Sequence, residues 1–81
     1  MDLNQIINEV NEIFKDVLDD NNIKLNPGTT ANDVEEWNSL SHIELVVAIE
    51  SRFKVRFTTA EIQNWKNVGQ MCESIEKRLK G

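Results

Sequence analysis

Apolar residues recur at spacings of three and four over the first nineteen positions, which is typical of the buried face of an amphipathic helix. These residues are Leu3, Ile6, Ile7, Val10, Ile13, Phe14, Val17 and Leu18. The pattern predicts a first helix over roughly residues 3–19, because the polar cluster DDNN at 19–22 then ends it. NPGTT at 26–30 indicates a turn, since Pro27 disfavours a helical residue before it and Gly28 admits positive φ.

A second apolar run begins only after a loop of nearly twenty residues. That length is unusual in a small domain unless the loop is functional, and residues 31–36 could supply one helical turn within it. The second run predicts a helix over about residues 39–53. Its apolar positions are Leu40, Ile43, Val46, Val47, Ile49 and Phe53, with Leu45 and Ala48 widening the apolar arc.

Two shorter patterns follow. Thr58 and Glu61 have the spacing of a capping box, with Phe57 and Ile62 placed as a hydrophobic staple, so a short third helix should begin there and end near Trp65. The spacing of Asn67 and Gln70 marks the start of a fourth helix that ends before Gly81. Its apolar stripe is Val68, Met71, Cys72, Ile75 and Leu79. The elements predict an all-α fold, a small four-helix bundle with a long first connection and a short third helix.

The composition fits one compact domain over residues 1–81, with 40% hydrophobic and 28% charged residues. Cys72 is the only cysteine, which excludes an internal disulfide and a multi-cysteine zinc site, and its place in a helical stripe favours a buried small hydrophobe. The apolar runs are short and interrupted by charge, and the first ten residues lack the features of a signal peptide. We therefore expect a cytoplasmic protein with no membrane insertion.

The formal net charge of −5 argues against nucleic-acid binding, because phosphate contacts need an excess of Lys and Arg. The charge is unevenly distributed. Residues 25–51 hold five acidic and no Lys or Arg residues, whereas residues 52–81 hold three acidic and seven basic residues. We expect an acidic surface around Ser39 that attracts basic partners, although most charged residues need do no more than solvate the surface.

A serine-rich helix start lies in EWNSLSHIEL at 35–44. Ser41 could cap the second helix, with Glu44 completing a capping box, or Asn38 could be the cap and Ser39 the first helical residue. In either case Ser39 is not needed as the cap, which leaves its hydroxyl free. A helix start also favours a phosphate group, through free N–H groups and the helix dipole.

The segment EWNSLSHIELVVAIESRF resembles the part of acyl carrier proteins that is built around Asp-Ser-Leu and followed by a helix of the kind ELVMALEEEF. Ser39 and Leu40 match the second and third positions of the motif. The helix that follows is matched at Glu44, Leu45, Val46, Ala48, Ile49, Glu50 and Phe53. The resemblance continues through a short third helix to the Val-Gly of KNVGQM, and so covers most of the chain.

The resemblance implies that Ser39 receives 4'-phosphopantetheine from coenzyme A through a phosphopantetheinyl transferase. The thiol of that arm would hold acyl groups as thioesters for acyl-transferring or condensing enzymes of fatty-acid, polyketide or related biosynthesis. The chain would thus be a carrier and not an enzyme, and a monomer, since it must be handed from one partner enzyme to the next. Such partners would bind the second helix through Asn38, Leu40, Glu44, Val47 and Glu50, and an acyl chain could be lined by Val46, Ile62 and Val68.

The chain departs from the family pattern at three places. Asn38 stands where an Asp usually precedes the serine, which keeps hydrogen bonding but removes a charge that could pair with a basic transferase. Ser41 and Arg52 replace positions that are commonly acidic in fatty-acid carriers. These changes leave the transferase and the pathway open, and a carrier for polyketide, peptide or saccharide-modifying systems fits as well as the general one.

Two other functions are compatible with parts of the sequence. A small hydrolase would pair Ser39 with His42, three residues apart on a helix, but no orienting acid or oxyanion site is evident. The alternative for His42 is an exposed polar helix residue. An unmodified interaction module of the same fold would use Trp37 and Trp65 as interface anchors, unless these side chains simply cover the core. Only a carrier needs Ser39.

Overall fold

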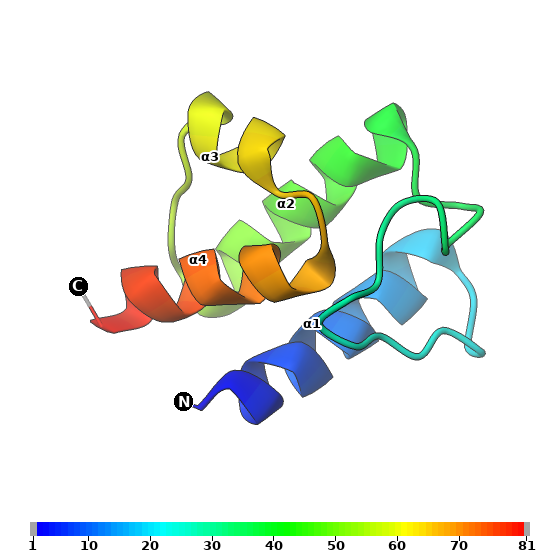
Figure 1. Cartoon of the computed structure of the whole chain (residues 1–81), viewed down its shortest axis with the longest axis horizontal. Helices are drawn as coiled ribbons and strands as arrows, with labels where there is room; N and C mark the ends of the chain where they lie inside the picture. Colours follow the sequence, from blue (N-terminus) through cyan, green and yellow to red (C-terminus); the bar gives the residue numbers. More distant parts are fainter. Residues whose placement is uncertain (1, 81) are drawn as a thin grey trace.

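The computed structural model describes residues 2–80 and contains four helices in that range. They are α1 (Leu3–Leu18), α2 (Ser39–Phe53), α3 (Thr59–Asn64) and α4 (Val68–Lys80). The predicted all-α bundle is confirmed, with three longer helices, a short third helix and a long connection between α1 and α2 (Figure 1).

Side-chain caps fix where the helices begin. Asp2 caps α1, and Thr58 caps α3 as predicted, with its hydroxyl accepting a bond from Glu61 N–H at 3.2 Å. The amide oxygen of Asn67 accepts a bond of 2.9 Å from Gln70 N–H at the start of α4. Each cap satisfies N–H groups that have no partner inside the helix, which is why the helix starts were readable from the sequence.

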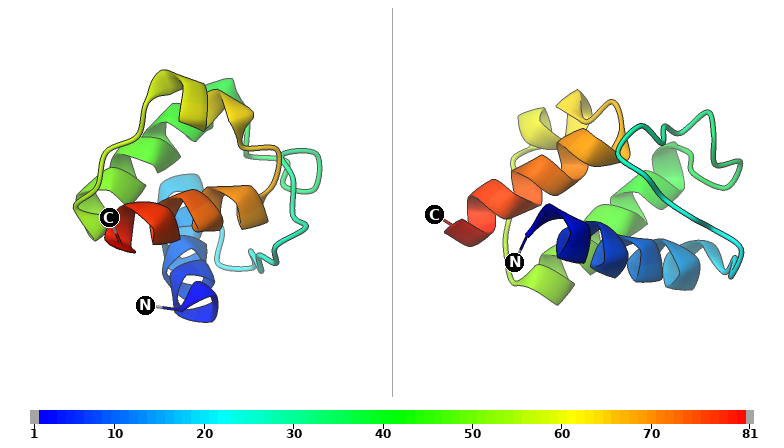
Figure 2. Two further views of the ribbon diagram at one scale, coloured as in Figure 1. Left: turned by 60° about the vertical axis from the view of Figure 1, so that its left-hand side comes forward. Right: turned by 60° about the horizontal axis from the view of Figure 1, so that its bottom comes forward.

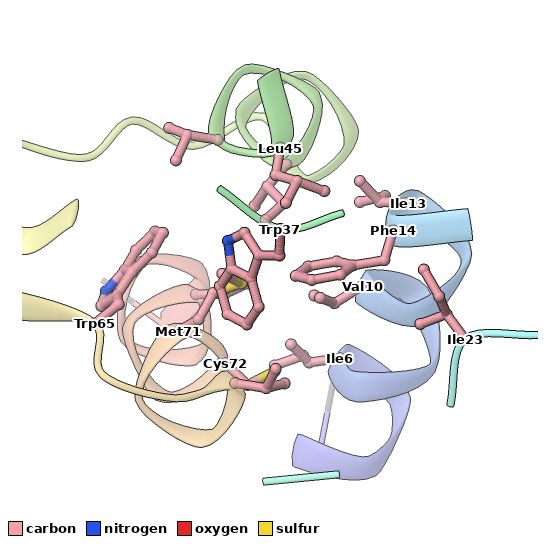
Figure 3. Close-up of a cluster of buried hydrophobic side chains, with 14 residues drawn as sticks. Ile6, Val10, Ile13, Phe14, Ile23, Trp37, Leu45, Trp65, Met71 and Cys72 are labelled. Carbon is pink, nitrogen blue, oxygen red and sulfur yellow. The ribbon is translucent and has the colours of Figure 1, made fainter. Parts of the chain in front are cut away.

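The core forms where α1 packs against both α2 and α4. Figure 3 shows Trp37 at its centre, pointing toward Phe14 of α1 and Met71 of α4. The rings of Trp37 and Phe14 meet edge to face, with centroids 5.0 Å apart. The buried hydrophobic residues are Ile6, Val10, Ile13, Phe14, Ile23, Trp37, Leu45, Val46, Ile49, Trp65, Val68, Met71, Cys72 and Ile75.

The long connection is tied down at several points although it holds no helix. Residues 31–33 and 35–36 form turns, so the helical turn considered for residues 31–36 is wrong. The carboxylate of Asp33 accepts a bond from Thr30 N–H at 3.0 Å, and such local side-chain bonds compete with helix formation. Elsewhere in the loop, Asn11 of α1 accepts a bond of 2.7 Å from Leu25 N–H, and the buried Thr29 accepts one of 2.9 Å from Val68 N–H.

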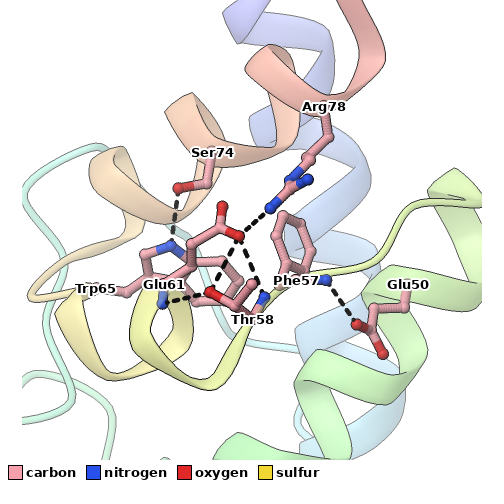
Figure 4. A network of polar contacts seen from close by, with 7 residues as sticks. All are labelled: Glu50, Phe57, Thr58, Glu61, Trp65, Ser74 and Arg78. Atoms are coloured by element: carbon pink, nitrogen blue, oxygen red, sulfur yellow. Dashed lines mark hydrogen bonds and ion pairs between the residues drawn. The ribbon is translucent and has the colours of Figure 1, made fainter. Parts of the chain in front are cut away.

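Polar contacts hold α3 against α4 and the end of α2 (Figure 4). Trp65 Nε1–H donates to Ser74 Oγ at 2.9 Å, and Glu61 forms an ion pair with Arg78. The Arg78 guanidinium and the backbone N–H of Thr58 lower the pKa of Glu61. Since α3 has no fully buried residue of its own, these contacts and the neighbouring aromatic rings are what fix its place.

The start of α2 lies at one end of the molecule, whereas the start of α1 and the end of α4 lie at the other (Figures 1 and 2). Part of the charge asymmetry follows this axis. Lys54, Arg56, Lys77 and Arg78 line a groove of about 510 Å³ together with Val55 and Glu61, at the end far from Ser39. Arg52 instead pairs with Glu9 of α1 and so helps to join two helices.

Candidate functional site

Ser39 is the first residue of α2, and Asn38 is its cap. The amide oxygen of Asn38 accepts bonds of 3.0 Å from both Leu40 N–H and Ser41 N–H. Of the two caps that the sequence allowed, the structure has Asn38. No hydrogen bond to the hydroxyl of Ser39 is found within residues 2–80, and the side chain is exposed. The hydroxyl is therefore accessible and is not used by the fold.

Ser41, two residues further on, has the opposite role. Its hydroxyl donates to the carbonyl oxygen of Glu36 at 2.8 Å and accepts from Asn38 N–H at 2.8 Å. These bonds complete the capping box and fasten the loop to the helix start. Ser41 therefore belongs to the scaffold that positions Ser39.

A groove of about 710 Å³ opens beside Ser39 between the start of α2 and α3. Its lining is mixed, with Trp37, Ile43, Ile62 and Trp65 among polar side chains that include Gln63 and Lys66. Of the residues expected to line an acyl chain, Ile62 lies in this groove. Val46 and Val68 are buried in the core at 5% and 0% exposure and are not on the groove wall, so their contact with cargo stays a prediction.

His42 lies on the wall of this groove between the two tryptophans. Trp37 Nε1–H donates to His42 Nδ1 at 3.1 Å, and the two rings stack with centroids 6.0 Å apart. The Trp65 ring meets the imidazole edge to face at 6.1 Å. The expectation of an exposed polar residue is thus wrong, because His42 is half-buried.

The sequence contains a pattern from which this contact between Trp37 and His42 could have been predicted. With Asn38 as the cap, Trp37 and His42 occupy the two positions of the staple that flanks a helix start. With Ser41 as the cap, the same two positions would instead be Leu40 and Leu45. Both tryptophans are core residues, at 6% and 9% exposure, and are not available as surface anchors of an interaction module.

The site lacks the arrangement that a hydrolase needs. His42 Nδ1 is held by an indole N–H and not by a carboxylate, and no hydrogen bond joins His42 to Ser39 among the described residues. A general base requires a bond to its nucleophile and an orienting acceptor on its other nitrogen. The described residues do not provide them.

An apolar stripe on the outer side of α2 begins next to Ser39. Leu40, Ile43 and Val47 are 73%, 63% and 60% exposed. The sequence placed Ile43 among the apolar positions of this helix without assigning it to a side, whereas Leu40 and Val47 were expected at a partner surface. Because apolar residues occupy both sides of α2, periodicity could not tell which side faces the core. We call Leu40, Ile43 and Val47 the outer stripe.

The two glutamates expected at a partner surface differ in their surroundings. Glu44 is exposed beside the outer stripe. Glu50 is half-buried, and its carboxylate accepts a bond of 2.9 Å from Phe57 N–H (Figure 4). On the loop, a hydrogen bond with Asp20 raises the pKa of Glu36, while the backbone N–H of Asn22 and that same bond lower the pKa of Asp20. Asp20, whose pKa is lowered, adds to the acidic character of this loop.

A small helical bundle that exposes a serine hydroxyl at a helix start, beside a groove and an apolar stripe, has the features that a prosthetic-group carrier domain needs. The comparisons agree. Residues 8–75 match the family model described as a phosphopantetheine attachment site. A curated acyl carrier protein of Acidothermus cellulolyticus is 32% identical over 71 residues, which cover 88% of this chain and 84% of that protein.

The solution structure of a holo acyl carrier protein from Geobacter metallireducens superposes with a TM-score of 0.88 at 39% identity, covering 93% of this chain and 86% of that one. The chain belongs to the acyl carrier protein family, and its prosthetic group is 4'-phosphopantetheine. The family acts as a carrier and not as a catalyst. Within residues 2–80, no helix has the length and apolar character needed to cross a membrane.

Proposed function

We propose that 4'-phosphopantetheine is attached to Ser39 Oγ by a phosphopantetheinyl transferase that uses coenzyme A. The observation that carries this proposal is the contrast between two neighbouring serines. The Ser41 hydroxyl makes two bonds of 2.8 Å within the scaffold, whereas the hydroxyl of Ser39 is exposed and makes none within the described residues. When bound, the group supplies a thiol that holds acyl cargo as a thioester.

The surroundings of Ser39 suit a phosphate-linked arm. Asn38 caps α2 with a neutral amide and so occupies two N–H groups without adding a negative charge beside the attachment oxygen. The positive end of the helix dipole therefore remains available to a phosphodiester on Ser39. The adjacent groove offers both apolar and polar walls to an arm that contains methyl groups, amides and a hydroxyl.

Partner enzymes dock, in this proposal, on the start of α2. The outer stripe supplies exposed apolar area. Glu44 and the carboxylates of the connection before α2 supply negative charge that attracts basic surfaces of the partner. The basic groove at Lys54 and Arg56 lies at the far end of the molecule. A basic partner is therefore attracted to the Ser39 end and repelled from the other, which orients it toward the attachment site.

The test is the intact mass of the protein after incubation with coenzyme A and a broad-specificity phosphopantetheinyl transferase. Wild type should gain one phosphopantetheinyl mass, and Ser39→Ala should gain none. Ser51→Ala is the matched control, because Ser51 is an exposed serine on the same helix and should be modified like wild type. Full modification of Ser39→Ala would reject Ser39 as the attachment site. If wild type gains no mass while a known carrier is modified in parallel, an unmodified interaction module is favoured.

A further inference from the structure

The groove beside Ser39 contains an imidazole whose tautomer is set by a neighbour. Trp37 Nε1 is a donor only, so the His42 Nδ1 that lies 3.1 Å from it must accept. A neutral imidazole with an accepting Nδ1 carries its proton on Nε2. Trp37 therefore makes His42 Nε2 a hydrogen-bond donor.

The ring is also held in place. Trp37 stacks on it at an interplanar angle of 25°, and Trp65 contacts it edge to face at 79°. Among residues 2–80 no acceptor is found for Nε2–H, although His42 is half-buried. A fixed donor without a protein partner on a groove wall is satisfied by water or by a ligand.

Ser39 and His42 are three residues apart on α2, so they are neighbours on the same face, and both line the groove. An arm attached to Ser39 Oγ thus begins next to the imidazole. We propose that His42 Nε2–H donates a hydrogen bond to an oxygen of the phosphopantetheine arm and holds that arm in the groove between Trp37 and Trp65. This inference rests on the proposed attachment at Ser39.

Ile43, the next residue after His42, belongs to both the groove wall and the outer stripe. A partner that covers the outer stripe therefore also contacts the edge of the groove. His42 would act as a positioning residue, because it keeps the arm close to the surface on which partners dock while no partner holds the arm. Preorganisation of this kind lowers the entropy lost when the arm is presented to a partner.

The test compares the apo and holo proteins by NMR, with the pantetheine part of coenzyme A labelled with ¹³C and ¹⁵N. In the holo protein we expect a shift of the His42 Nε2 resonance and nuclear Overhauser effects from the arm to the His42 and Trp65 rings. His42→Phe keeps an aromatic ring but lacks the donor. In the holo form of this variant, the ¹³C or ³¹P resonance of the arm atom next to the bonded oxygen should no longer be shifted from its position in free phosphopantetheine. Gln63→Ala, which removes another polar side chain of the groove, should keep that shift.

The mass measurement distinguishes a failure of the proposed attachment at Ser39 from a failure of the proposed role of His42. A holo mass combined with arm resonances like those of free phosphopantetheine, and a His42 Nε2 resonance like that of the apo protein, would overturn the role of His42 and leave the attachment site intact. Absence of a holo mass would overturn both. The apo and holo comparison uses the wild-type chain, so it gives a result even if His42→Phe fails to fold. If Gln63→Ala also loses the arm shift, the contact belongs to the groove in general, which contradicts the proposed role of His42.

Discussion

The backbone N–H of Gly69 donates a hydrogen bond of 2.9 Å to the carbonyl oxygen of Pro27. This bond joins the start of α4 to the long connection between α1 and α2. A Cβ atom added at position 69 would lie 2.9 Å from that same carbonyl oxygen and 3.2 Å from Pro27 Cβ. Glycine at 69 thus allows the loop to approach α4 closely enough for the bond to form.

Gly69→Ala should therefore destabilise the protein by about 1–3 kcal/mol, because the backbone of Pro27 must move away from a packed helix start. Urea unfolding followed by circular dichroism measures the change. Gly28→Ala is the control, since its nearest contact would be an ordinary 3.4 Å, and it should leave the stability equal or slightly higher. Equal stability of Gly69→Ala and wild type would show that the loop yields freely.

The cap of α2 depends on the amide oxygen of Asn38, which accepts two bonds. Asn38→Ala should lower the free energy of unfolding by about 1 kcal/mol, while Asn38→Asp keeps both acceptor bonds and adds about 0.3–1 kcal/mol through the helix dipole. Thermal unfolding at low ionic strength distinguishes the two variants. An Asp variant as unstable as the Ala variant would mean that the cap geometry, as described, is not what stabilises this helix start.

The outer stripe should matter for binding and not for folding. Ile43→Ser and Val47→Ser remove apolar groups that already face solvent, so each should change the free energy of unfolding by no more than about 0.5 kcal/mol. Leu45→Ala, at a residue with no exposed surface, should cost about 2–5 kcal/mol. The rate of modification by the transferase should fall in the two Ser variants. Large losses of stability in them would place the stripe in the core.

Cys72 should be chemically inert in the folded protein. Burial raises the pKa of its thiol to about 12, so at pH 8 only on the order of one molecule in ten thousand carries the reactive thiolate. The apo protein should thus resist iodoacetamide at pH 8 and react only when unfolded in urea. The holo protein should take one label, on the prosthetic thiol. Rapid labelling of folded apo protein would contradict the burial of Cys72.

The Glu61–Arg78 ion pair should make part of the stability depend on pH. Arg78 and the Thr58 N–H lower the pKa of Glu61 below 4.5, so the unfolded chain binds that proton more readily than the folded protein. The stabilisation is present above pH 4.5 and is lost as the pH falls through the lowered pKa. The stability difference between wild type and Glu61→Gln should shrink over that range in urea titrations. A difference that does not vary with pH would exclude the charge as its source.

Features set by neighbours in the sequence were predictable, and features set by distant contacts were not. The bounds of α2 and the Thr58 cap follow from local spacing, and the structure reproduces both. The side on which Ile43 lies was not predictable, because α2 has apolar residues on two sides and only the packing of α1 decides which side is buried. The bond between Pro27 and Gly69 joins segments far apart in the chain, and no periodicity reports it.

The two apolar sides of α2 are under different evolutionary constraints. Leu45, Val46 and Ile49 are buried in the packed bundle, whereas the residues of the outer stripe are largely exposed to solvent. Substitutions at Leu40, Ile43 and Val47 are thus free to accumulate without loss of foldability. Under the proposed docking of partners on the outer stripe, a lineage can exchange one set of partner enzymes for another while the same scaffold, and the same serine, are retained.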